Sequence, residues 1–292
     1  MTFDKLISNK VGFVQGTKFT VIIGSTPSKT ARSPKIWNSL YKKYKIKCKM
    51  YPCDTKIKDL KKLIKSIILD NNFLGGAVTE PFKSEILKYV NYQDNAVKQI
   101  GAANIILKKN NKLYAFNTDY LAIKQNFHQL KKKIKIKNIA ILGCGGVGKS
   151  AVVAAKNVFK KKKIFVFLRK NKNNLKFEKK LKSQYVKFYP FSELINYKNI
   201  SLLINSTTIG FPKIVKIKGQ NINYKHFSPI SFDKVEEIIK LNKMEKKKLI
   251  DLNIEYMNLF KFKNKNVLIF DLIYNQDIGI IQFEYNGKHM AI

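Results

Sequence analysis

The sequence is poor in arginine, cysteine, proline and long hydrophobic runs. Only Arg32 and Arg169 are arginines among 57 basic residues, although the formal net charge is +38. A charge of this size suits nucleic-acid binding through counterion release. Arginine, however, makes the bidentate contacts to bases and phosphates, and the chain has no cluster of basic residues and base-stacking aromatic residues. We therefore expect no specific nucleic-acid partner and interpret the lysine excess as a solvated surface.

The three cysteines, Cys48, Cys53 and Cys144, are too few and too irregular for a disulfide framework. No second Cys or His pair lies near the first two to complete a zinc site, so no metal is expected. Residues 1–19 lack the apolar core of a signal peptide, and no run reaches the roughly 18 apolar residues that span a bilayer. These absences predict a cytoplasmic protein with no membrane segment.

The 292 residues are 45% hydrophobic and 12% aromatic, which suits a folded chain of two domains. Short apolar runs alternate with longer amphipathic ones, which is typical of an α/β fold with helices on both faces of a mainly parallel sheet. Residues 104–119 contain two β-type runs around Asn110 and Asn111, which accept positive φ, and so predict a hairpin. Elsewhere in the first half we expect strands at 19–24, 46–51 and 74–79, and helices at 34–45, 56–70 and 80–90, the last opened by Pro81.

The second half begins with an apolar strand at 138–142 and an Ala/Val-rich helix. Further strands are predicted at 163–168, 185–189, 202–207 and 247–252, and a final strand after residue 266 passes into a helix. Between the first strand and its helix, Gly143, Gly145 and Gly148 have G-x-G-x-x-G spacing, in the context that dinucleotide binding requires. Gly143 would permit the tight turn and Gly145 the approach of the pyrophosphate to the helix N-terminus. A glycine turn without a ligand is the alternative.

The residues after the strand at 163–168 distinguish the two nicotinamide cofactors. Arg169, Lys170 and Lys172 follow this strand, and no acidic residue does. An NAD site usually places Asp or Glu here to accept the ribose hydroxyls, whereas a 2′-phosphate pairs with a basic group. NADP is therefore the expected cofactor.

Seven segments occur in the order found in the shikimate dehydrogenase family, which the chain resembles over roughly residues 19–288. They are "SPKIWNSLY", "AVTEPFK", "GAANII", "FNTD", "ILGCGGVG", "INSTTIG" and "YNQ". The resemblance implies an NADP-dependent oxidoreductase that interconverts 3-dehydroshikimate and shikimate in aromatic amino-acid (chorismate) biosynthesis. It also implies an α/β catalytic domain at 1–122 plus 271–292, with the C-terminal helix returning to it, and a Rossmann-like, doubly wound NADP-binding domain at 123–270. A monomer or homodimer is expected.

The resemblance also implies a catalytic pair, Lys83 and Asp119. Reducing a ketone by hydride requires a general acid for the new alkoxide. A lysine in the first turn of a helix at 80–90 would lie against the macrodipole, which disfavours its charge, and the carboxylate would favour it. The alternatives are a surface lysine for Lys83 and a helix N-cap for Asp119.

The remaining site residues are implied by matching positions. Ser33, Thr79, Asn104 and Gln276 would bind the substrate, although Ser33 could instead cap a helix and Gln276 face solvent. The cofactor would contact Gly143, Gly145, Gly146, Gly148, Arg169, Lys170, Asn205 and Thr207.

Several positions depart from the family pattern: Ala31 replaces a serine, Ala77 an asparagine and Ile254 a tyrosine, and Leu168 lies in the altered phosphate segment. Thr30, beside Ala31, offers a substitute hydroxyl. These departures leave open a dehydrogenase that also accepts quinate, and a degenerate paralogue without catalysis.

Overall fold

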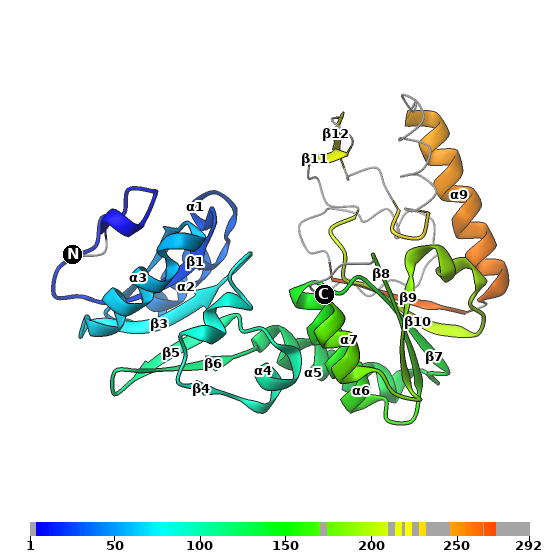
Figure 1. The fold of residues 1–292 in the computed structure, drawn as a ribbon, viewed down its shortest axis with the longest axis horizontal. Coiled ribbons are helices and arrows are strands. Elements are labelled where there is room, and N and C mark those ends of the chain that lie inside the picture. Colours follow the sequence, from blue (N-terminus) through cyan, green and yellow to red (C-terminus); the bar gives the residue numbers. More distant parts are fainter. Residues whose placement is uncertain are drawn as a thin grey trace. The chain divides into compact units, whose positions relative to one another are not determined.

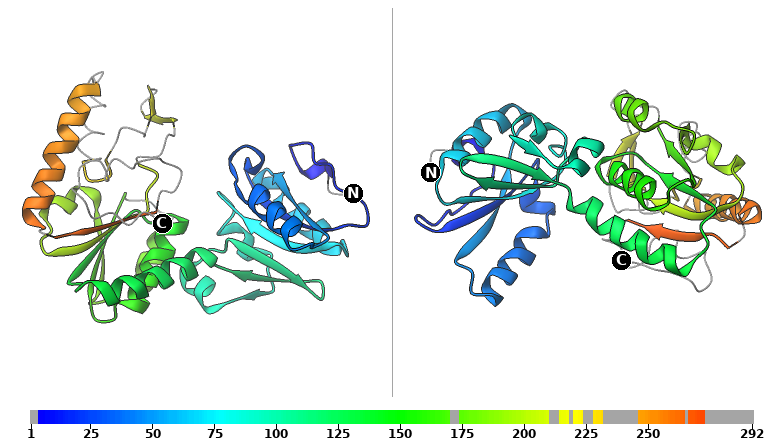
Figure 2. Two further views of the ribbon diagram at one scale, coloured as in Figure 1. Left: turned by 180° about the vertical axis from the view of Figure 1, so that it is seen from behind. Right: turned by 90° about the horizontal axis from the view of Figure 1, so that it is seen from below.

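The computed structural model describes residues 4–169, 174–209, 214–217, 220–223, 228–231, 246–264 and 266–272. The chain divides into two compact units, Met1–Leu121 and Ala122–Ile292. Each unit contains its own sheet (Figures 1 and 2), and the predicted α/β fold with a Rossmann-like second sheet is confirmed. The predicted return of the C-terminal helix falls on residues 273–292, which lie outside the described residues, so the predicted domain limits stay a prediction.

The first sheet has six strands in the order β2-β1-β3-β5-β6-β4. Its parallel part consists of β1 (Lys18–Gly24), β2 (Cys48–Asp54) and β3 (Phe73–Val78). Helix α3 (Ile57–Leu69) packs on the sheet face that carries Val21 and Ile23, whereas Tyr41 of α2 (Ser33–Lys43) packs beside Ile22. Because successive strand residues point to opposite faces, the two helices cover opposite faces of the sheet. Short segments η1 (Asp4–Leu6) and α1 (Pro27–Thr30) flank β1.

From β3 to β6 the sheet is antiparallel, and this part contains the predicted hairpin. Strands β5 (Ile105–Lys109) and β6 (Lys112–Phe116) pair around Asn110 and Asn111, which have φ values of 49° and 55°. The hairpin prediction is therefore confirmed, and it makes the sheet mixed. Strand β4 (Tyr92–Gln93) pairs in parallel with β6, and α4 (Asn95–Ile100) follows β4.

The second unit has an all-parallel sheet in the order β13-β10-β7-β8-β9. Its strands are β7 (Asn138–Leu142), β8 (Lys163–Leu168), β9 (Val186–Pro190), β10 (Ile200–Asn205) and β13 (Leu268–Asp271). The helical segments are α5 (Thr118–Lys133), which begins in the first unit, α6 (Gly146–Val158), α7 (Leu175–Leu181), η4 (Phe191–Asn196) and α9 (Lys246–Lys263). Strand β11 (Ile214–Ile217) pairs antiparallel with β12 (Gln220–Asn223).

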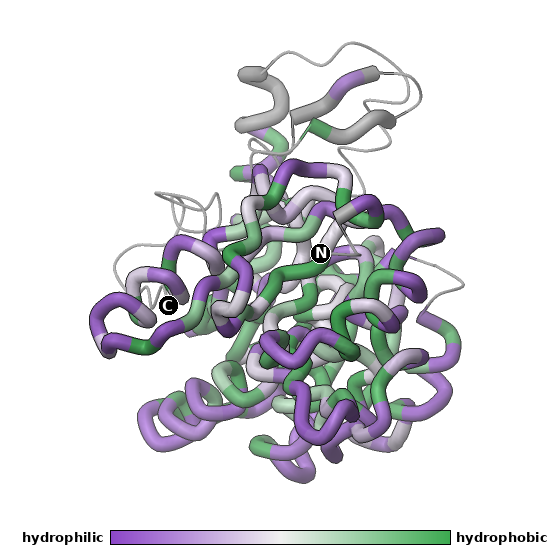
Figure 3. Tube along the Cα trace, turned by 90° about the vertical axis from the view of Figure 1, so that its left-hand side faces the viewer, coloured by the Kyte–Doolittle hydropathy of each residue, from purple (hydrophilic) through white to green (hydrophobic). Residues whose placement is uncertain are grey.

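The hydrophobic residues concentrate on the strands and the hydrophilic ones on outer helices and turns (Figure 3). The predicted strand at 247–252 is wrong, because these residues begin helix α9. Asn253, Met257, Phe260 and Asn264 of this region are buried at spacings of three and four, which is the helical period.

Candidate active site

Three segments that carry predicted site residues meet at one edge of the first sheet. Lys83 follows β3, Asn104 precedes β5 and Asp119 follows β6. Because β5 runs antiparallel to β3 and β6 antiparallel to β5, the end of β3, the start of β5 and the end of β6 share one edge. The sheet topology therefore gathers residues that are distant in the sequence.

Lys83 and Asp119 form an ion pair, with 2.7 Å between Lys83 Nζ and Asp119 Oδ2. Their side chains are 18% and 28% exposed, so both are partly buried yet accessible. Asn104 Nδ2 donates to Asp119 Oδ1 at 2.8 Å and to Thr118 Oγ1 at 2.9 Å, and Asn104 Oδ1 accepts the Thr118 N–H at 2.8 Å. Each carboxylate oxygen of Asp119 thus has its own donor, which fixes its orientation.

The predicted helix at 80–90 is wrong. Residues 80–84 form turns, and only Glu85–Lys88 form the short 3-10 helix η2. Backbone groups here bond to other segments, because the Ala103 N–H donates to Lys83 O at 2.8 Å and the Ser25 N–H donates to Glu80 O at 3.2 Å. Phe82 anchors the turn in the core. The macrodipole argument therefore does not apply to Lys83. The charged group that interacts with the Lys83 amine is its partner, the Asp119 carboxylate.

Asp119 is not the N-cap of its helix. The Asn117 side chain accepts the Tyr120 N–H at 2.9 Å and donates to Ala102 O at 3.0 Å, so Asn117 caps α5. Asp119 lies in the first turn of α5, where the macrodipole favours a negative charge. The sequence reasoning missed Asn117, although Asn directly before a helix is the usual signal of a cap.

Other predicted substrate residues lie at the same sheet edge. The Thr79 N–H donates to Ile23 O at 2.9 Å directly after β3, and Ser33 is the first residue of α2. Arg32 occupies the N-cap position, so Ser33 is not the cap. Thr30 Oγ1 donates to Thr26 O at 3.0 Å within α1. Gln276 lies outside the described residues.

In the second unit the glycine loop follows β7. Gly143 has a φ of 93°, which favours glycine, and an added Cβ at Gly148 would lie 2.7 Å from both Gly143 O and Ser206 Oγ. At Gly145, by contrast, a Cβ would meet no atom within 4 Å. The protein itself therefore requires glycine at 143 and 148, while the space over Gly145 stays open beside the N-terminus of α6, as pyrophosphate binding needs.

Strand order places this loop at the switch point of the sheet. From β7 the chain proceeds through β8 to β9 on one side and then returns to β10 on the other side, so ligands of such sheets bind at the carboxyl ends of β7 and β10. Ser206 follows β10 and donates from Oγ to Leu142 O at 2.6 Å, which ties the two ends together. The sequence reasoning missed this serine, whose signal was its place directly after the strand.

The other predicted cofactor residues surround the switch point. Asn205 is buried, and its Oδ1 accepts from the Thr207 N–H and Oγ1 at 3.1 and 2.8 Å, so its amide shapes the turn. Gly146 opens α6, and the exposed Arg169 directly follows β8. Lys170 lies outside the described residues. The open glycine, the helix N-terminus and the basic residue fit a dinucleotide.

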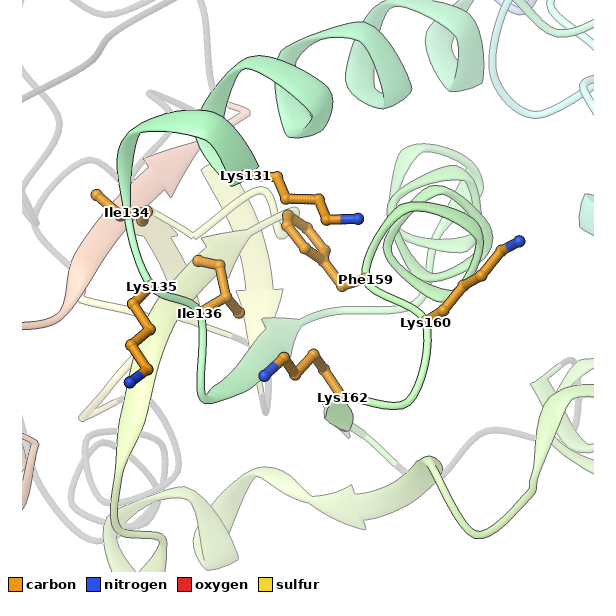
Figure 4. Close-up of a pocket in the computed structure, with 7 residues that line it drawn as sticks. All are labelled: Lys131, Ile134, Lys135, Ile136, Phe159, Lys160 and Lys162. Atoms are coloured by element: carbon orange, nitrogen blue, oxygen red, sulfur yellow. The ribbon is translucent and has the colours of Figure 1, made fainter.

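A small hollow of about 190 Å³ lies between the end of α5, the start of β7 and the α6–β8 turn. Figure 4 shows Phe159 and Ile136 beside its lysines, with Lys135 and Lys160 pointing in opposite directions. Because the hollow contains no acid and its amines do not converge, it lacks the groups of an acid–base or anion site. It is at the amino end of β7, opposite the glycine loop.

Within the described ranges, no group of three His, Cys, Asp or Glu side chains is placed to hold a metal ion. The described helices include none that is long and apolar enough to cross a membrane.

A Rossmann-like sheet with a glycine loop at its switch point, in one chain with an α/β unit that holds a Lys–Asp pair, defines the class of dinucleotide-dependent dehydrogenases. Residues 22–106 match the family model described as the shikimate dehydrogenase substrate binding domain. The chain is 30% identical over 250 residues to shikimate dehydrogenase (NADP(+)) of Clostridium botulinum strain 657, an alignment covering 82% of this chain and 88% of that enzyme. The chain belongs to the shikimate dehydrogenase family and is an oxidoreductase of that family.

A second relative and a solved structure are also similar to this chain. Shikimate dehydrogenase (NADP(+)) of Clostridium beijerinckii is 34% identical over 183 residues, covering 62% of this chain and 65% of that enzyme. The structure of shikimate 5-dehydrogenase from Listeria monocytogenes in complex with shikimate and NAD superposes with a TM-score of 0.64 and 17% identity, covering 94% of this chain and 85% of that chain. At this identity the structural likeness shows the fold alone.

Proposed function

We propose that this chain is an NADP-dependent shikimate dehydrogenase that interconverts 3-dehydroshikimate and shikimate in aromatic amino-acid biosynthesis. The ion pair between Lys83 Nζ and Asp119 Oδ2, at 2.7 Å and partly exposed, carries the proposal. Family membership supports it, because the two clostridial relatives are both named shikimate dehydrogenase (NADP(+)).

Reduction of the ring ketone adds a hydride to carbon and a proton to oxygen. NADPH supplies the hydride when it is bound. The Lys83 ammonium donates the proton to the ring oxygen, and Asp119 stabilises the ammonium before transfer. In the direction of oxidation the neutral amine accepts the proton of the ring hydroxyl. Asn104 holds the Asp119 carboxylate toward Lys83 throughout.

The substrate would be bound by Ser33, Thr79, Asn104 and Gln276, in a domain of residues 1–122 plus 271–292. Neutral donors and acceptors suit a polyhydroxy acid, because each unpaired hydroxyl buried in the site is costly. Asn104 Oδ1 retains a second lone pair beside its bond to Thr118.

The cofactor would be bound by residues 123–270. The N-terminus of α6 with Gly143, Gly145, Gly146 and Gly148 would hold the pyrophosphate, next to the turn of Asn205 and Thr207. Arg169 and Lys170 would pair with the 2′-phosphate, for which guanidinium geometry is well suited.

The test is a turnover assay of the full chain with shikimate and quinate, each with NADP and NAD, beside Lys83→Ala. Turnover of shikimate with NADP that the variant loses is the expected result. Equal turnover of quinate would indicate broader specificity. No turnover with either acid and either cofactor would refute the proposal and make the chain a non-catalytic paralogue, with Ala31, Ala77 and Ile254 as the responsible departures.

A further inference from the structure

Asp54, at the end of β2, is a buried carboxylate with an unusual set of partners. The residue is 6% exposed, and within the described part of the chain no cationic group lies within ion-pair distance. Its Oδ1 accepts the Ser28 N–H at 2.8 Å and its Oδ2 accepts the Ser28 hydroxyl at 2.5 Å. Burying a carboxylate costs free energy unless it is well hydrogen-bonded. Because the two oxygens of Asp54 accept their hydrogen bonds from a single exposed serine, we interpret the carboxylate as holding that serine in place.

Ser28 belongs to α1, a single turn that cannot be stable alone. Helices shorter than about 12 residues are marginal in water, and α1 has four residues. Thr26, at its N-cap position, makes no side-chain capping hydrogen bond. Asp54 accepts one of the first N–H groups of the turn, which have no intrahelical acceptor, and so performs the stabilising role from another strand.

The turn leads directly to Ser33, one of the predicted substrate residues. Thr30 ends α1 and Ser33 begins α2, with Ala31 between them in place of the family serine. The same loop is tied to the turn of Lys83 by the Ser25 N–H to Glu80 O bond. With one serine missing, the position of the remaining hydroxyls depends on how α1 is held.

We propose that Asp54 is a positioning residue: through Ser28 it fixes the loop of residues 25–33, in which Ser33 is predicted to bind the substrate. This inference rests on the proposed function. Both oxygens of Asp54 accept from the exposed Ser28 while Asp54 itself is buried, so the carboxylate orders the loop without facing solvent as a competing anion.

The test compares the full-length wild type with Asp54→Ala, Asp54→Asn and Ser28→Ala. The matched control is Asp70→Ala, because Asp70 Oδ1 also accepts a backbone N–H, from Asn72 at 2.8 Å, but at the amino end of β3. Hydrogen exchange of peptides covering residues 25–33 is measured without ligand, and KM and kcat are measured with shikimate and NADP.

For Asp54→Ala we expect faster exchange at 25–33 and a KM for shikimate raised about tenfold, the size of one hydrogen bond to a charged group, with kcat and the KM for NADP within about twofold. Ser28→Ala should increase the exchange rate at 25–33 and the KM for shikimate in the same direction but by less. Asp54→Asn retains a hydrogen-bond acceptor, so its exchange at 25–33 and its KM for shikimate should be closer to those of the wild type than in Asp54→Ala. Asp70→Ala should change neither.

Unchanged exchange in Asp54→Ala and Ser28→Ala would refute the inference that Asp54 holds this loop, and faster exchange with an unchanged KM for shikimate would refute the inference that the loop positions a substrate-binding residue. Should Asp54→Ala fail to fold, Ser28→Ala and Asp54→Asn decide by the same criteria. Absence of shikimate turnover in the wild type would refute the proposed function and with it the role of this loop in substrate binding, whereas the exchange data show separately whether Asp54 holds the loop.

Discussion

Replacing Lys83 by Met tests the acid–base pair most directly. Met retains an unbranched side chain of similar size to the aliphatic part of Lys and removes the amine that lies 2.7 Å from Asp119 Oδ2. A positioned general acid contributes about 10²- to 10⁴-fold to rate, which corresponds to about 3–5 kcal/mol in the activation free energy. We therefore expect kcat for shikimate oxidation to fall by at least about 100-fold.

The stability of this variant should change little. The Asp119 side chain is 28% exposed, so water can replace the lost amine, and its Oδ1 keeps the hydrogen bond from Asn104. A partly exposed ion pair contributes about 1 kcal/mol or less to the free energy of unfolding. Urea unfolding should accordingly show a shift of this size, and titration with NADP should give an unchanged Kd.

Lys88→Met is the matched control for this experiment. Lys88 Nζ lies 2.6 Å from Glu85 Oε2, and the Lys88 side chain is 64% exposed. The hydrogen bond to Glu85 raises the pKa of Lys88, yet this local pair is on the surface. Its loss should leave kcat and KM as in the wild type. If Lys83→Met retained kcat within about threefold of the wild type, or if Lys88→Met lost as much, the assignment of Lys83 would be refuted.

Three further outcomes are expected. Gly145→Ala should melt like the wild type but bind NADP at least about tenfold more weakly, because its Cβ enters open space, whereas Gly148→Ala should unfold at lower temperature because its Cβ would lie 2.7 Å from Gly143 O; equal melting temperatures would contradict this. Cys144, whose pKa burial raises to about 12, should carry only about one thiolate in 10⁴ at pH 8 and react with a maleimide more slowly than Cys48, as peptide mass mapping would show. Arg169→Ala should raise the KM for NADP about tenfold and leave that for NAD unchanged; a parallel rise in both would exclude 2′-phosphate recognition.

The fold was predictable wherever one residue type or a short pattern decides the structure. The turn at Asn110 and Asn111 is such a case, because two consecutive asparagines accept positive φ. The segment at 247–252 was not, since a six-residue window of mixed apolar and charged residues contains too little of the helical period. Only the longer span to Asn264 shows it. At 80–90 Pro81 predicted a helix, but the Ser25 and Ala103 N–H groups donate to backbone carbonyls of this segment and it forms turns instead. No local sequence pattern contains these tertiary hydrogen bonds.

Residue spacing alone identifies Gly143, Gly145 and Gly148 as candidates for a dinucleotide-binding loop, but it does not distinguish their roles. The structure separates them by the atoms that an added Cβ would meet. At Gly143 and Gly148 a Cβ would be crowded, so packing requires glycine there, whereas at Gly145 the space is open, which indicates a glycine that serves ligand binding. The positions of Ser206 directly after a strand and of Asn117 directly before a helix were signals in the sequence, but the partners of these two residues and of Asp54 could not be predicted. Their contacts join segments 15 to 64 positions apart, so the partners appear only once the strands are aligned.

Lys83 illustrates how a functional lysine is distinguished in a chain with 57 basic residues. Charge count and amphipathic pattern treat every lysine alike. What separates Lys83 from Lys88 is the span of its partner: Lys88 pairs with a carboxylate three positions away on the surface, whereas Lys83 pairs with one 36 positions away that is itself held by Asn104. A long-range pair requires β3, β5 and β6 to be assembled in their observed order. The acid–base geometry is therefore a product of the folded sheet, so a variant that shifts the β5–β6 register should reduce kcat even with Lys83 and Asp119 intact.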